Sequence, residues 1–470
     1  MVKAFPESAF AALKSRSLDL RSETLEARKK RLKTLEMWIH TNRDRIKQAV
    51  HTDYKKPLLE VDTSEIYPVL TELRHVLRHL DRWASPVKVD ATPSYIGTRS
   101  EVRYEPKGTC LIVAPWNFPF NLCLGPLVSC LAAGNNAVVK PSEWTPNTSR
   151  IIREMVEEVF PADIVQVVEG GIEISKHLLT FPFDHIFFTG STTVGKLVME
   201  AASKHLSSVT LELGGKSPTI IDRTANLRDA AKRIAFGKFI NNGQTCIAPD
   251  YILIDAKIHD TFIGLLKNET KKLFGDGNEI VETSPSYSRL ATSRQFERVI
   301  SLVAEAVLRG AHAEKLGNQN KDENFLAPTI LTHVPSGARI WEEEIFGPVL
   351  PLKTFETPQQ AIEFINRRPK PLALYVFSRR KAFQESILRQ TTSGSACIND
   401  CVLQFTHPNL PFGGINHSGF GKSHGQYGFK AFSNEKPVLR QKSGWSGPYL
   451  LHPPYTKKMK RIVDALLKWF

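Results

Sequence analysis

Two kinds of hydrophobic spacing divide the chain. Within residues 24–50, apolar side chains recur every three or four positions with Lys and Arg between them, which is the spacing of amphipathic helices. We therefore predict two or three helices in residues 6–83. Residues 85–106 alternate apolar and polar positions instead, a pattern that indicates a β-hairpin. Its apolar positions are Val87, Val89, Ile96, Val102 and Tyr104.

From residue 108 onward, short apolar runs alternate with segments of helical spacing. The runs predict buried strands at 109–114, 136–141, 164–168, 185–189, 218–221 and 251–255. The helical segments include 145–159, 226–240 and 257–273. Strand–helix alternation with apolar strands indicates an α/β fold, in which helices cover both faces of a parallel sheet. A second such cycle follows Glu212 and continues to about residue 398.

Composition limits the class of protein. A chain of 470 residues suffices for about three domains. Hydrophobic residues make up 41% and charged residues 23%, as is typical of a globular protein. The net charge is +14, but no basic run in the chain interior is interleaved with aromatic residues, so we expect no nucleic-acid partner.

The sequence gives no signal for secretion, membrane spanning or metal binding. Its N-terminus lacks the apolar core of a signal peptide. The longest apolar stretch, 122–133, is interrupted by Gly125 and Pro126 and is too short to cross a bilayer. We therefore expect a cytoplasmic protein. The six cysteines form no C-x-x-C pair and no zinc-ligand spacing, so we expect most of them in the core.

One cysteine differs from the others in its surroundings. Cys246 lies in the segment 241–250, directly after Asn, Gly, Gln and Thr residues. A thiol in such a polar loop is a candidate nucleophile, whereas a lone cysteine is more often a core residue. The polar neighbours favour the nucleophile.

Two further segments supply groups that such a nucleophile needs. Glu212 interrupts an apolar run before a Gly-Gly turn. A carboxylate among apolar residues has a raised pKa and can act as a general base. Asn117 lies between aromatic residues and prolines, where its amide can hold a developing oxyanion. The alternatives are a surface carboxylate and a turn asparagine.

Two strand ends are candidates for binding a dinucleotide. The predicted strand 185–189 is followed by a helix that opens with Gly190, Ser191 and Gly195. Glycine-rich turns of this kind bind phosphates at the helix N-terminus, although the spacing is not G-x-G-x-x-G. At another strand end, Lys140 and Glu143 are within reach of a ribose, and the alternative is a polar β-turn.

Together these segments resemble the aldehyde dehydrogenase superfamily, and the resemblance covers essentially the whole chain. The shared motifs occur in the family's order: Pro-Trp-Asn-Phe-Pro (115–119), Lys-Pro-Ser-Glu (140–143), Phe-Thr-Gly-Ser-Thr-x-x-Gly (188–195), Leu-Glu-Leu-Gly-Gly-Lys-Ser-Pro (211–218), Gly-Gln-Thr-Cys (243–246) and Glu-Glu-Ile-Phe-Gly-Pro (343–348). The short N-terminus, Lys-Pro-Leu-Ala-Leu-Tyr (370–375) and Leu-Pro-Phe-Gly-Gly (410–414) are similar to the class 3 branch, which contains fatty and aromatic aldehyde dehydrogenases.

The resemblance implies NAD(P)-dependent oxidation of a medium- or long-chain aliphatic or an aromatic aldehyde to its acid. Cys246 would attack the aldehyde, and Asn117 and the backbone N–H of Cys246 would hold the oxyanion of the thiohemiacetal. Glu212 would activate the water that hydrolyses the thioester. A carboxylate at Glu143 would repel a 2′-phosphate, so we expect NAD, with NADP use left open. The implied cofactor contacts are Trp116, Lys140, Glu143, Gly190, Ser191, Gly195, Glu344 and Phe346.

The resemblance also implies a domain organisation. We expect a Rossmann-like cofactor domain formed by residues 1–84 and 107–212, and an α/β catalytic domain formed by residues 213–398. A strand extension would comprise residues 85–106 and 399–440. In this family the extension pairs between subunits, so we expect a homodimer.

Residues 441–470 form a C-terminal tail whose end has helical spacing. We predict an amphipathic helix that docks on its own or a partner subunit, lies on a membrane surface, or covers a substrate funnel. The tail is too short to span a membrane. One helical face would carry Met459, Ile462, Val463, Leu466, Leu467 and Phe470, with Lys and Arg on much of the rest.

Two alternative functions remain open on the sequence. A CoA-acylating enzyme would pass the thioester to CoA, which a hydrolytic base at Glu212 argues against. A non-catalytic binding protein of the same fold would need neither Cys246 nor Glu212, and both are present.

Overall fold

The computed structural model describes residues 5–90, 95, 97–275, 277–444, 449 and 452–469, so that Ile96 and Phe470 of the predictions lie outside the described residues. The N-terminal region contains more helices than predicted. Only Asn42 separates the second helix from the third. The spacing of apolar residues in 24–50 continues across this break, so the sequence does not show where one helix ends and the next begins. The helices are α1 (Glu7–Leu20), α2 (Leu25–Thr41), α3 (Arg43–Tyr54), α4 (Leu58–Val61) and α5 (Tyr67–Ala84), with a π-helical turn, Asp62–Ile66, before α5.

The first sheet confirms the predicted α/β fold. Its strand order is β17-β7-β6-β3-β4-β5, and all strands are parallel except β17, which pairs antiparallel with β7. The strands are β3 (Thr109–Val113), β4 (Asn136–Lys140), β5 (Val165–Val167), β6 (His185–Gly190), β7 (Ser208–Leu213) and β17 (Gly419–Phe420). The accompanying helices are α6 (Asn121–Ala133), α7 (Pro146–Val159), α8 (Ile172–Leu178) and α9 (Thr192–Ser203).

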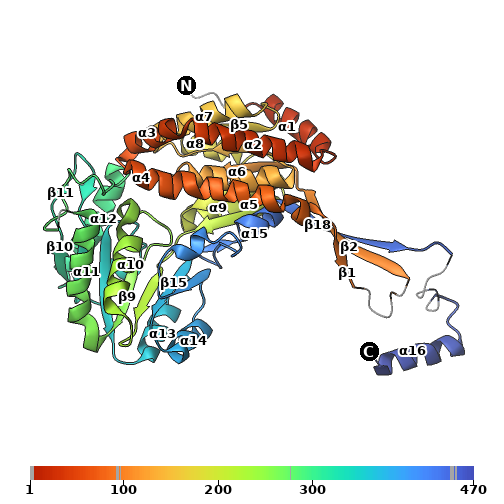
Figure 1. Cartoon of the computed structure of the whole chain (residues 1–470). Helices are drawn as coiled ribbons and strands as arrows, with labels where there is room; N and C mark the ends of the chain where they lie inside the picture. Colours follow the sequence, from red (N-terminus) through yellow and green to blue (C-terminus); the bar gives the residue numbers. More distant parts are fainter. Residues whose placement is uncertain are drawn as a thin grey trace.

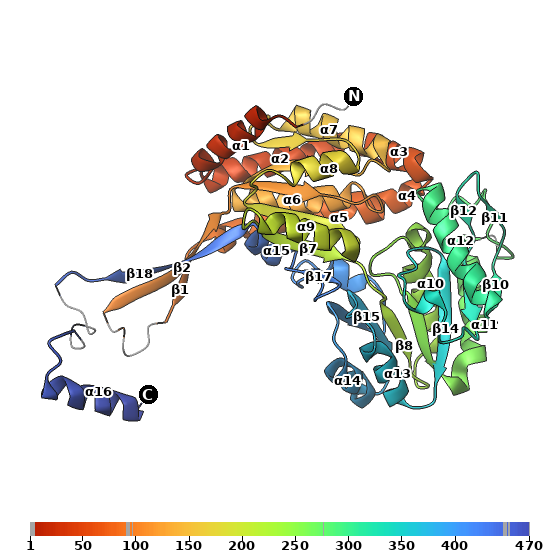
Figure 2. The ribbon, with the colours of Figure 1, turned by 180° about the vertical axis from the view of Figure 1, so that it is seen from behind.

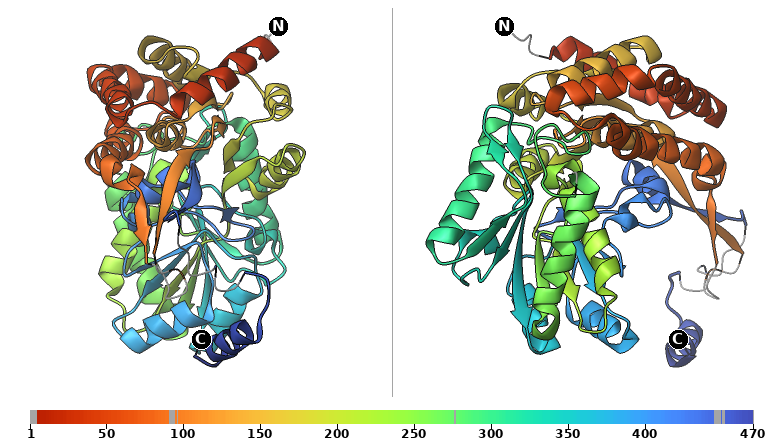
Figure 3. Two further views of the ribbon diagram at one scale, coloured as in Figure 1. Left: turned by 90° about the vertical axis from the view of Figure 1, so that its right-hand side faces the viewer. Right: turned by 60° about the vertical axis from the view of Figure 1, so that its left-hand side comes forward.

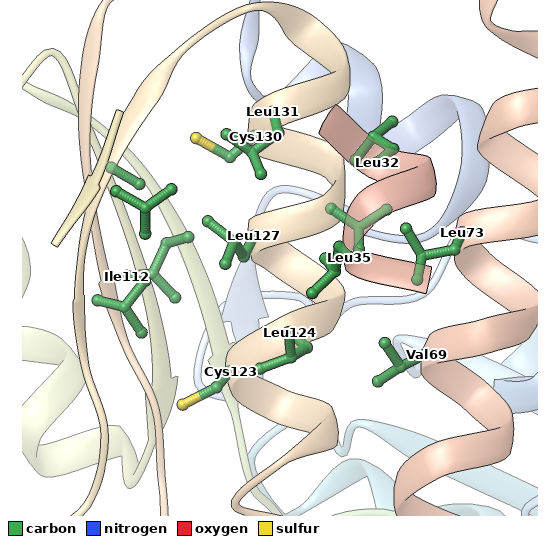
Figure 4. Packing of buried hydrophobic residues seen from close by; sticks show 14 of the residues in the cluster. Leu32, Leu35, Val69, Leu73, Ile112, Cys123, Leu124, Leu127, Cys130 and Leu131 are labelled. Carbon is green, nitrogen blue, oxygen red and sulfur yellow. The ribbon is translucent and has the colours of Figure 1, made fainter. Parts of the chain in front are cut away.

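Helices cover this sheet on both faces. Ile112 of β3 belongs to a core shared with α2, α5, α6 and α7, and Figure 4 shows it facing Leu127 of α6. The preceding residue of β3, Leu111, belongs to a separate core with α1, α8 and α9. Because neighbouring strand residues point to opposite faces, both faces of the sheet are buried.

The strand order also creates a switch point. The chain runs outward from β3 to β4 and β5, then returns to form β6 and β7 on the other side of β3. The connections after β3 and β6 therefore diverge at the carboxyl ends of the strands. In open α/β sheets this crevice is where nucleotides bind.

A second α/β unit contains a sheet of order β10-β13-β14-β9-β8-β15-β16, parallel except at β10. Figure 3 shows it below the first unit. The strands are β8 (Pro218–Ile221), β9 (Tyr251–Asp255), β10 (His312–Lys315), β13 (Thr329–Thr332), β14 (Val349–Phe355), β15 (Ala373–Phe377) and β16 (Ser395–Ile398), and β11 (Gln319–Asn320) pairs separately with β12 (Phe325–Leu326). The helices are α10 (Leu227–Phe239), α11 (His259–Phe274), α12 (Ser293–Leu308), α13 (Pro358–Asn366) and α14 (Lys381–Gln390).

An arm of three antiparallel strands projects from the first unit (Figures 1 and 2). It consists of β1 (Val87–Val89), β2 (Thr98–Pro106) and β18 (Ser433–Gln441). The predicted hairpin in 85–106 is correct, because β1 pairs antiparallel with β2. Of the predicted second segment, 399–440, only β18 pairs into the arm. Its earlier part packs on both units. Cys401 and Phe412 join a core of the second unit, whereas β17 pairs with β7 and α15 (Gly425–Ala431) packs on α5 and α6 of the first.

The C-terminal tail ends in α16 (Lys457–Trp469), which agrees with the predicted helix. Figures 1 and 2 show α16 below the arm, apart from the helices of both α/β units. Within the described residues, no helix combines the length and apolar character needed to cross a bilayer.

Candidate active site

Cys246 lies in a tightly fixed loop between α10 and β9. Asn241 and Asn242 both have φ of 54°, a left-handed conformation that asparagine tolerates better than most residues. The side chain of Gln244 donates to the carbonyls of Asn241 and Arg289, each at 2.9 Å. Its Oε1 accepts a hydrogen bond from the backbone of Ala291 at 2.9 Å. These contacts leave the thiol loop little freedom.

Asn117 follows β3 and reaches this loop from the first unit. Its Nδ2 donates to the carbonyl oxygen of Gln244 at 2.9 Å. Its own carbonyl oxygen accepts from the hydroxyl of Tyr54 at 2.9 Å and from Nδ2 of Asn241 at 2.8 Å. Asn117 is 2% exposed, so its side chain and its backbone are both held in place.

Glu212 lies on β7 and is buried. Its Oε1 accepts a hydrogen bond from Oγ of Ser423 at 2.8 Å, whereas its Oε2 has no hydrogen-bond partner among the described residues. Burial raises the pKa of Glu212 to about 8, in spite of the opposing effects of Ser423 and Lys422. Such a carboxyl releases and accepts a proton near neutral pH, as a general base must.

Cys246 and Glu212 line the same small cavity, of about 50 Å³. Burial raises the pKa of the Cys246 thiol, and the negative charges of Glu344 and Glu212 raise it further. The backbone N–H groups of Cys246 and Ile247 act in the opposite direction. The thiol is therefore neutral in this state and needs a base before it can react.

A loop of the second unit brings Glu344 and Phe346 to the same place. Oδ1 of Asp250 accepts from the backbone N–H of Ile345 at 2.9 Å, and Arg298 donates to the carbonyl of Glu344 at 3.0 Å. The ring of Phe346 lies edge-on to that of Trp116, with centroids 5.4 Å apart. Two residues predicted as cofactor contacts thus meet across the two units.

The remaining predicted cofactor residues lie at the carboxyl ends of β4 and β6. Nζ of Lys140 lies 2.7 Å from Oε2 of Glu143. Gly190 ends β6, and Oγ of Ser191 accepts from the backbone of Val194 at 3.3 Å, which caps α9. Gly195 is buried where α9 crosses β7. A side chain does not fit there, because a Cβ atom would lie 2.6 Å from Leu213.

A larger cavity, of about 180 Å³, is also lined by Cys246 but not by Glu212. Most of its surface is apolar, which suits the hydrocarbon part of a ligand rather than a sugar or an acid. Its walls are Thr63, Ser64, Pro68, Phe118, Asn121, Leu122, Phe236, Ile240, Thr245, Cys246, Ile247, Val402, Phe405 and Thr406.

Sequence reasoning missed several residues that support the site. Tyr54 and Gln244 hold Asn117, and Ser423 holds Glu212. Ser423 lies in the glycine-rich segment that was predicted to belong to the arm. Tyr54 is an ordinary core position in its helix, and no local signal in the sequence distinguishes it.

The comparisons with known proteins all indicate one family. Residues 3–438 match the model of the Aldehyde dehydrogenase family. The chain is 41% identical to the 4,4'-diaponeurosporen-aldehyde dehydrogenase of Staphylococcus aureus, over 94% of this chain and 95% of that protein. It is also 41% identical to Aldehyde dehydrogenase family 3 member A2 of Mus musculus, over 98% of this chain and 93% of that protein.

A solved structure described as the substrate-bound state of Staphylococcus aureus AldH aligns with a TM-score of 0.94. The two chains are 38% identical, and the alignment covers 99% of this chain and 100% of that one. The likeness therefore extends over both α/β units and the arm.

Proposed function

The chain belongs to the class 3-like branch of the aldehyde dehydrogenase family, and we propose that it oxidises apolar aldehydes through a thioester on Cys246. It is an NAD(P)-dependent enzyme that converts aldehydes to carboxylic acids. The substrate class and the roles of individual residues are the proposal. The observation that carries it is the single cavity lined by Cys246 and Glu212, beside a loop to which Asn117 is hydrogen-bonded.

In the first half-reaction, Cys246 forms a bond to the aldehyde carbon. The thiol proton passes to solvent water, and the thiolate attacks, so Glu212 stays available as the base of the second half-reaction. The free N–H of the Asn117 amide and the backbone N–H of Cys246 donate to the oxyanion that forms. Bound NAD(P)+ would supply the hydride acceptor for this carbon. What remains on Cys246 is a thioester.

In the second half-reaction, Glu212 acts as the base for hydrolysis. Its unpartnered Oε2 can accept a hydrogen bond from a water molecule, because buried polar atoms without protein partners are commonly satisfied by water. Glu212 takes a proton from this water as the water oxygen attacks the thioester carbon. The C–S bond then breaks, the acid leaves, and the Cys246 sulfur is free again.

The residues at the strand ends fit a dinucleotide. The amides of the first turn of α9 and the Ser191 hydroxyl suit a phosphate, and Lys140 and Glu143 suit the hydroxyls of a ribose. Val194 and Leu197 of α9 are 43% and 58% exposed beside this turn, an apolar surface on which a purine ring can lie. Glu344 and the ring pair Trp116–Phe346 lie at the opposite end, next to Cys246.

The apolar cavity beside Cys246 supports a hydrocarbon substrate, aliphatic or aromatic. The Staphylococcus aureus relative is named for a 4,4'-diaponeurosporen-aldehyde, and a substrate of long hydrocarbon character agrees with the lining of this cavity. A panel of aliphatic and aromatic aldehydes of increasing length, assayed with NAD+ and with NADP+, tests the substrate class. We expect kcat/KM to rise with chain length, and a preference for short or charged aldehydes would contradict the proposal.

Three measurements separate the alternatives to this function. Cys246→Ala should lose turnover and still bind dinucleotide, and retained turnover would remove Cys246 from the mechanism. Acid should form without added CoA, and acyl-CoA formation in its place would indicate a CoA-acylating enzyme. Absence of any NADH signal with every aldehyde would favour a non-catalytic binding protein.

The arm supports a homodimer. The strand register aligns Val89, Ser100 and Leu439 in one row across β1, β2 and β18, and directly opposed residues share a face of the sheet. The apolar side chains Val87, Val89 and Leu439 lie on this face and are 46%, 49% and 52% exposed. An uncovered apolar face on a projecting sheet suits a second copy of the chain.

Light scattering coupled to size-exclusion chromatography tests this proposal. Leu439→Lys should shift the protein from dimer to monomer. Val438→Lys is the matched control, because Val438 lies on the same strand and points to the opposite face. Equal behaviour of the two variants would contradict a dimer built on the apolar face.

The tail supports peripheral contact with a membrane. By helical spacing, one face of α16 carries Met459, Ile462, Val463 and Leu466. Figures 1 and 2 show no helix of the two α/β units beside α16. Five cationic residues, Lys457, Lys458, Lys460, Arg461 and Lys468, lie around that face against one acid, Asp464. Helices of this composition bind anionic membrane surfaces.

Co-sedimentation with vesicles of anionic and of neutral lipid tests the membrane contact. Deletion of residues 456–470 and Leu466→Asp should both abolish binding to anionic vesicles. Ala465→Asp, which adds the same charge to the polar face, should retain most of it. Unchanged binding after the deletion would contradict the proposal. Turnover of long and of short aldehydes by the same deletion variant tests whether the helix covers a substrate funnel.

A further inference from the structure

A fully buried ion pair lies beneath the loop that carries Asn117. Nζ of Lys56 is 2.7 Å from Oε1 of Glu65, and both side chains are 0% exposed. Nζ of Lys56 also lies 4.1 Å from the centroid of the Phe118 ring. A buried pair of this kind costs desolvation and adds little stability compared with apolar residues. The pair contacts Phe118, the residue directly after Asn117. Its presence there therefore needs a reason other than stability.

Glu65 holds the start of the helix that follows the Asn117 loop. Its Oε2 accepts from the backbone N–H of Asn121, the first residue of α6, at 2.9 Å. No side-chain cap of its own is present at this end of α6. A carboxylate at a helix N-terminus satisfies unpaired N–H groups and complements the helix dipole.

Lys56 acts on the other side of the loop. Its Nζ is 3.5 Å from the carbonyl oxygen of Asn117, the same oxygen that accepts from Tyr54 and Asn241. One ion pair thus contacts both the Asn117 peptide and the helix start four residues later. The backbone between these two points carries the Asn117 side chain, whose amide also donates to Gln244.

The same short segment also reaches the thiol loop. Glu60, at the end of α4, accepts from the backbone N–H of Asn241 at 2.9 Å through its Oε1. The following π-helical turn, Asp62–Ile66, carries Glu65. Such turns are rare within α-helices and are frequent at functional sites. Here the turn lets one segment direct Glu60 and Glu65 at two different loops.

We propose that Lys56 and Glu65 are a positioning pair that fixes the Asn117 amide toward the reacting carbonyl oxygen. Neither residue lines the two cavities at Cys246, so the pair acts through the 117–121 backbone. This inference rests on the proposed role of Asn117 as an oxyanion donor. It assigns a reaction-related role to a segment that carries none of the family motifs identified in the sequence.

A double-mutant cycle in single-turnover NADH formation tests the inference. Asn117→Ala alone should slow hydride transfer by roughly 100-fold, as loss of an oxyanion donor does. Glu65→Gln alone should slow it by roughly 10-fold, because a misdirected donor loses part of that stabilisation. In the Asn117→Ala background, Glu65→Gln should change the rate by less than about 2-fold, since linked residues are non-additive.

Two further variants separate positioning from folding. Lys56→Met with Glu65→Leu replaces the pair by apolar residues, which commonly preserves stability, and should keep the melting temperature while hydride transfer stays slow. Glu23→Gln breaks the pair of Glu23 with Arg31 near α2, and should leave hydride transfer unchanged. Dinucleotide affinity should be unchanged in Asn117→Ala, in Glu65→Gln, in their combination and in the apolar double variant.

The outcomes distinguish the inference from the function on which it rests. Equal slowing by Glu65→Gln in both backgrounds, or wild-type hydride transfer in the apolar double variant, would overturn the positioning role. A wild-type rate for Asn117→Ala would instead overturn the proposed oxyanion donor.

Discussion

The side-chain amide of Asn117 donates a hydrogen bond to the backbone carbonyl of Gln244, with 2.9 Å between nitrogen and oxygen. This bond joins the loop after β3 in the first unit to the thiol loop in the second. A primary amide has two N–H groups. One holds the two loops together, and the other remains free to donate to an oxyanion.

The rate of thioester hydrolysis should depend on pH through Glu212. Burial raises the pKa of this carboxyl to about 8, so at neutral pH most of it is protonated and unable to accept a proton from water. Acid formation in the steady state should rise as the pH increases through about 8 and then level off. Stopped-flow measurement should show the NADH burst most clearly at the low end of this range.

Glu212→Gln is the control for this pH dependence. It cannot act as a base at any pH, so its hydrolysis should be slow and independent of pH over the same range. A wild-type profile that falls between neutral pH and about pH 8 would contradict the assignment.

Stability should fall between about pH 4.5 and about pH 7 because of Glu72. This carboxyl is 9% exposed and accepts from the backbone of Gly425 at 2.8 Å. Burial raises its pKa from 4.5 to about 7, so the folded state binds the proton more tightly than the unfolded state. The stabilisation that this protonated carboxyl adds to the free energy of unfolding is complete below pH 4.5 and is lost as the pH rises to about 7. The loss amounts to roughly 3 kcal/mol at most.

Thermal unfolding midpoints at acidic and at mildly alkaline pH measure this effect. Glu72→Gln keeps an oxygen acceptor for Gly425 and cannot ionise, so its midpoint should fall less than that of the wild type. A fall of the same size in both proteins would show that Glu72 is not responsible.

Cofactor preference should respond to the charge at Glu143. This carboxylate is paired with Lys140, and in the proposed ribose contact it would repel a 2′-phosphate. Glu143→Gln should lower the KM for NADP+ by roughly 10-fold and change that for NAD+ by less than about 3-fold. Salt should weaken the effect, because the side chain is partly exposed.

Glu157→Gln, on the exposed side of α7, provides the comparison for Glu143→Gln. It removes the same charge from the same unit and should leave both KM values unchanged. If the two variants respond alike, a general effect of net charge explains the preference better than contact with the ribose.

The apolar cavity should set the preference for chain length. Ile240 lines this cavity beside Cys246, and Ile240→Trp would fill part of it. The variant should lose about 10-fold in kcat/KM for a long aliphatic aldehyde, since overfilling costs about 1–3 kcal/mol. Propanal should be turned over nearly as before, and an equal loss for both aldehydes would place the substrate elsewhere.

The sequence motifs were enough to predict the α/β fold and a cluster of candidate residues. Strands β3, β4, β6, β8 and β9 lie within a residue or two of their predicted ranges, because buried parallel strands are apolar throughout and turn residues bound them. The candidates Trp116 and Phe346 are 230 positions apart, and only their motifs connected them before the structure showed their rings in contact.

What the sequence could not reveal depends on contacts between distant segments. Lys56 and Glu65 resemble solvent-exposed charges in their neighbourhood, and only the tertiary structure buries both of them. Gly419 pairs with Glu212 across more than two hundred residues, so the glycine-rich segment joins the first unit rather than the arm. Local spacing contains no information about either pairing.

Trapping the covalent intermediate tests the central claim most directly. Glu212→Gln, mixed with NAD+ and a long aliphatic aldehyde and then quenched with acid, should release one NADH per subunit and stop. Intact-mass and peptide analysis should then find the acyl group as a thioester on Cys246. Continued turnover to acid, or an acyl group on any residue other than Cys246, would contradict the account.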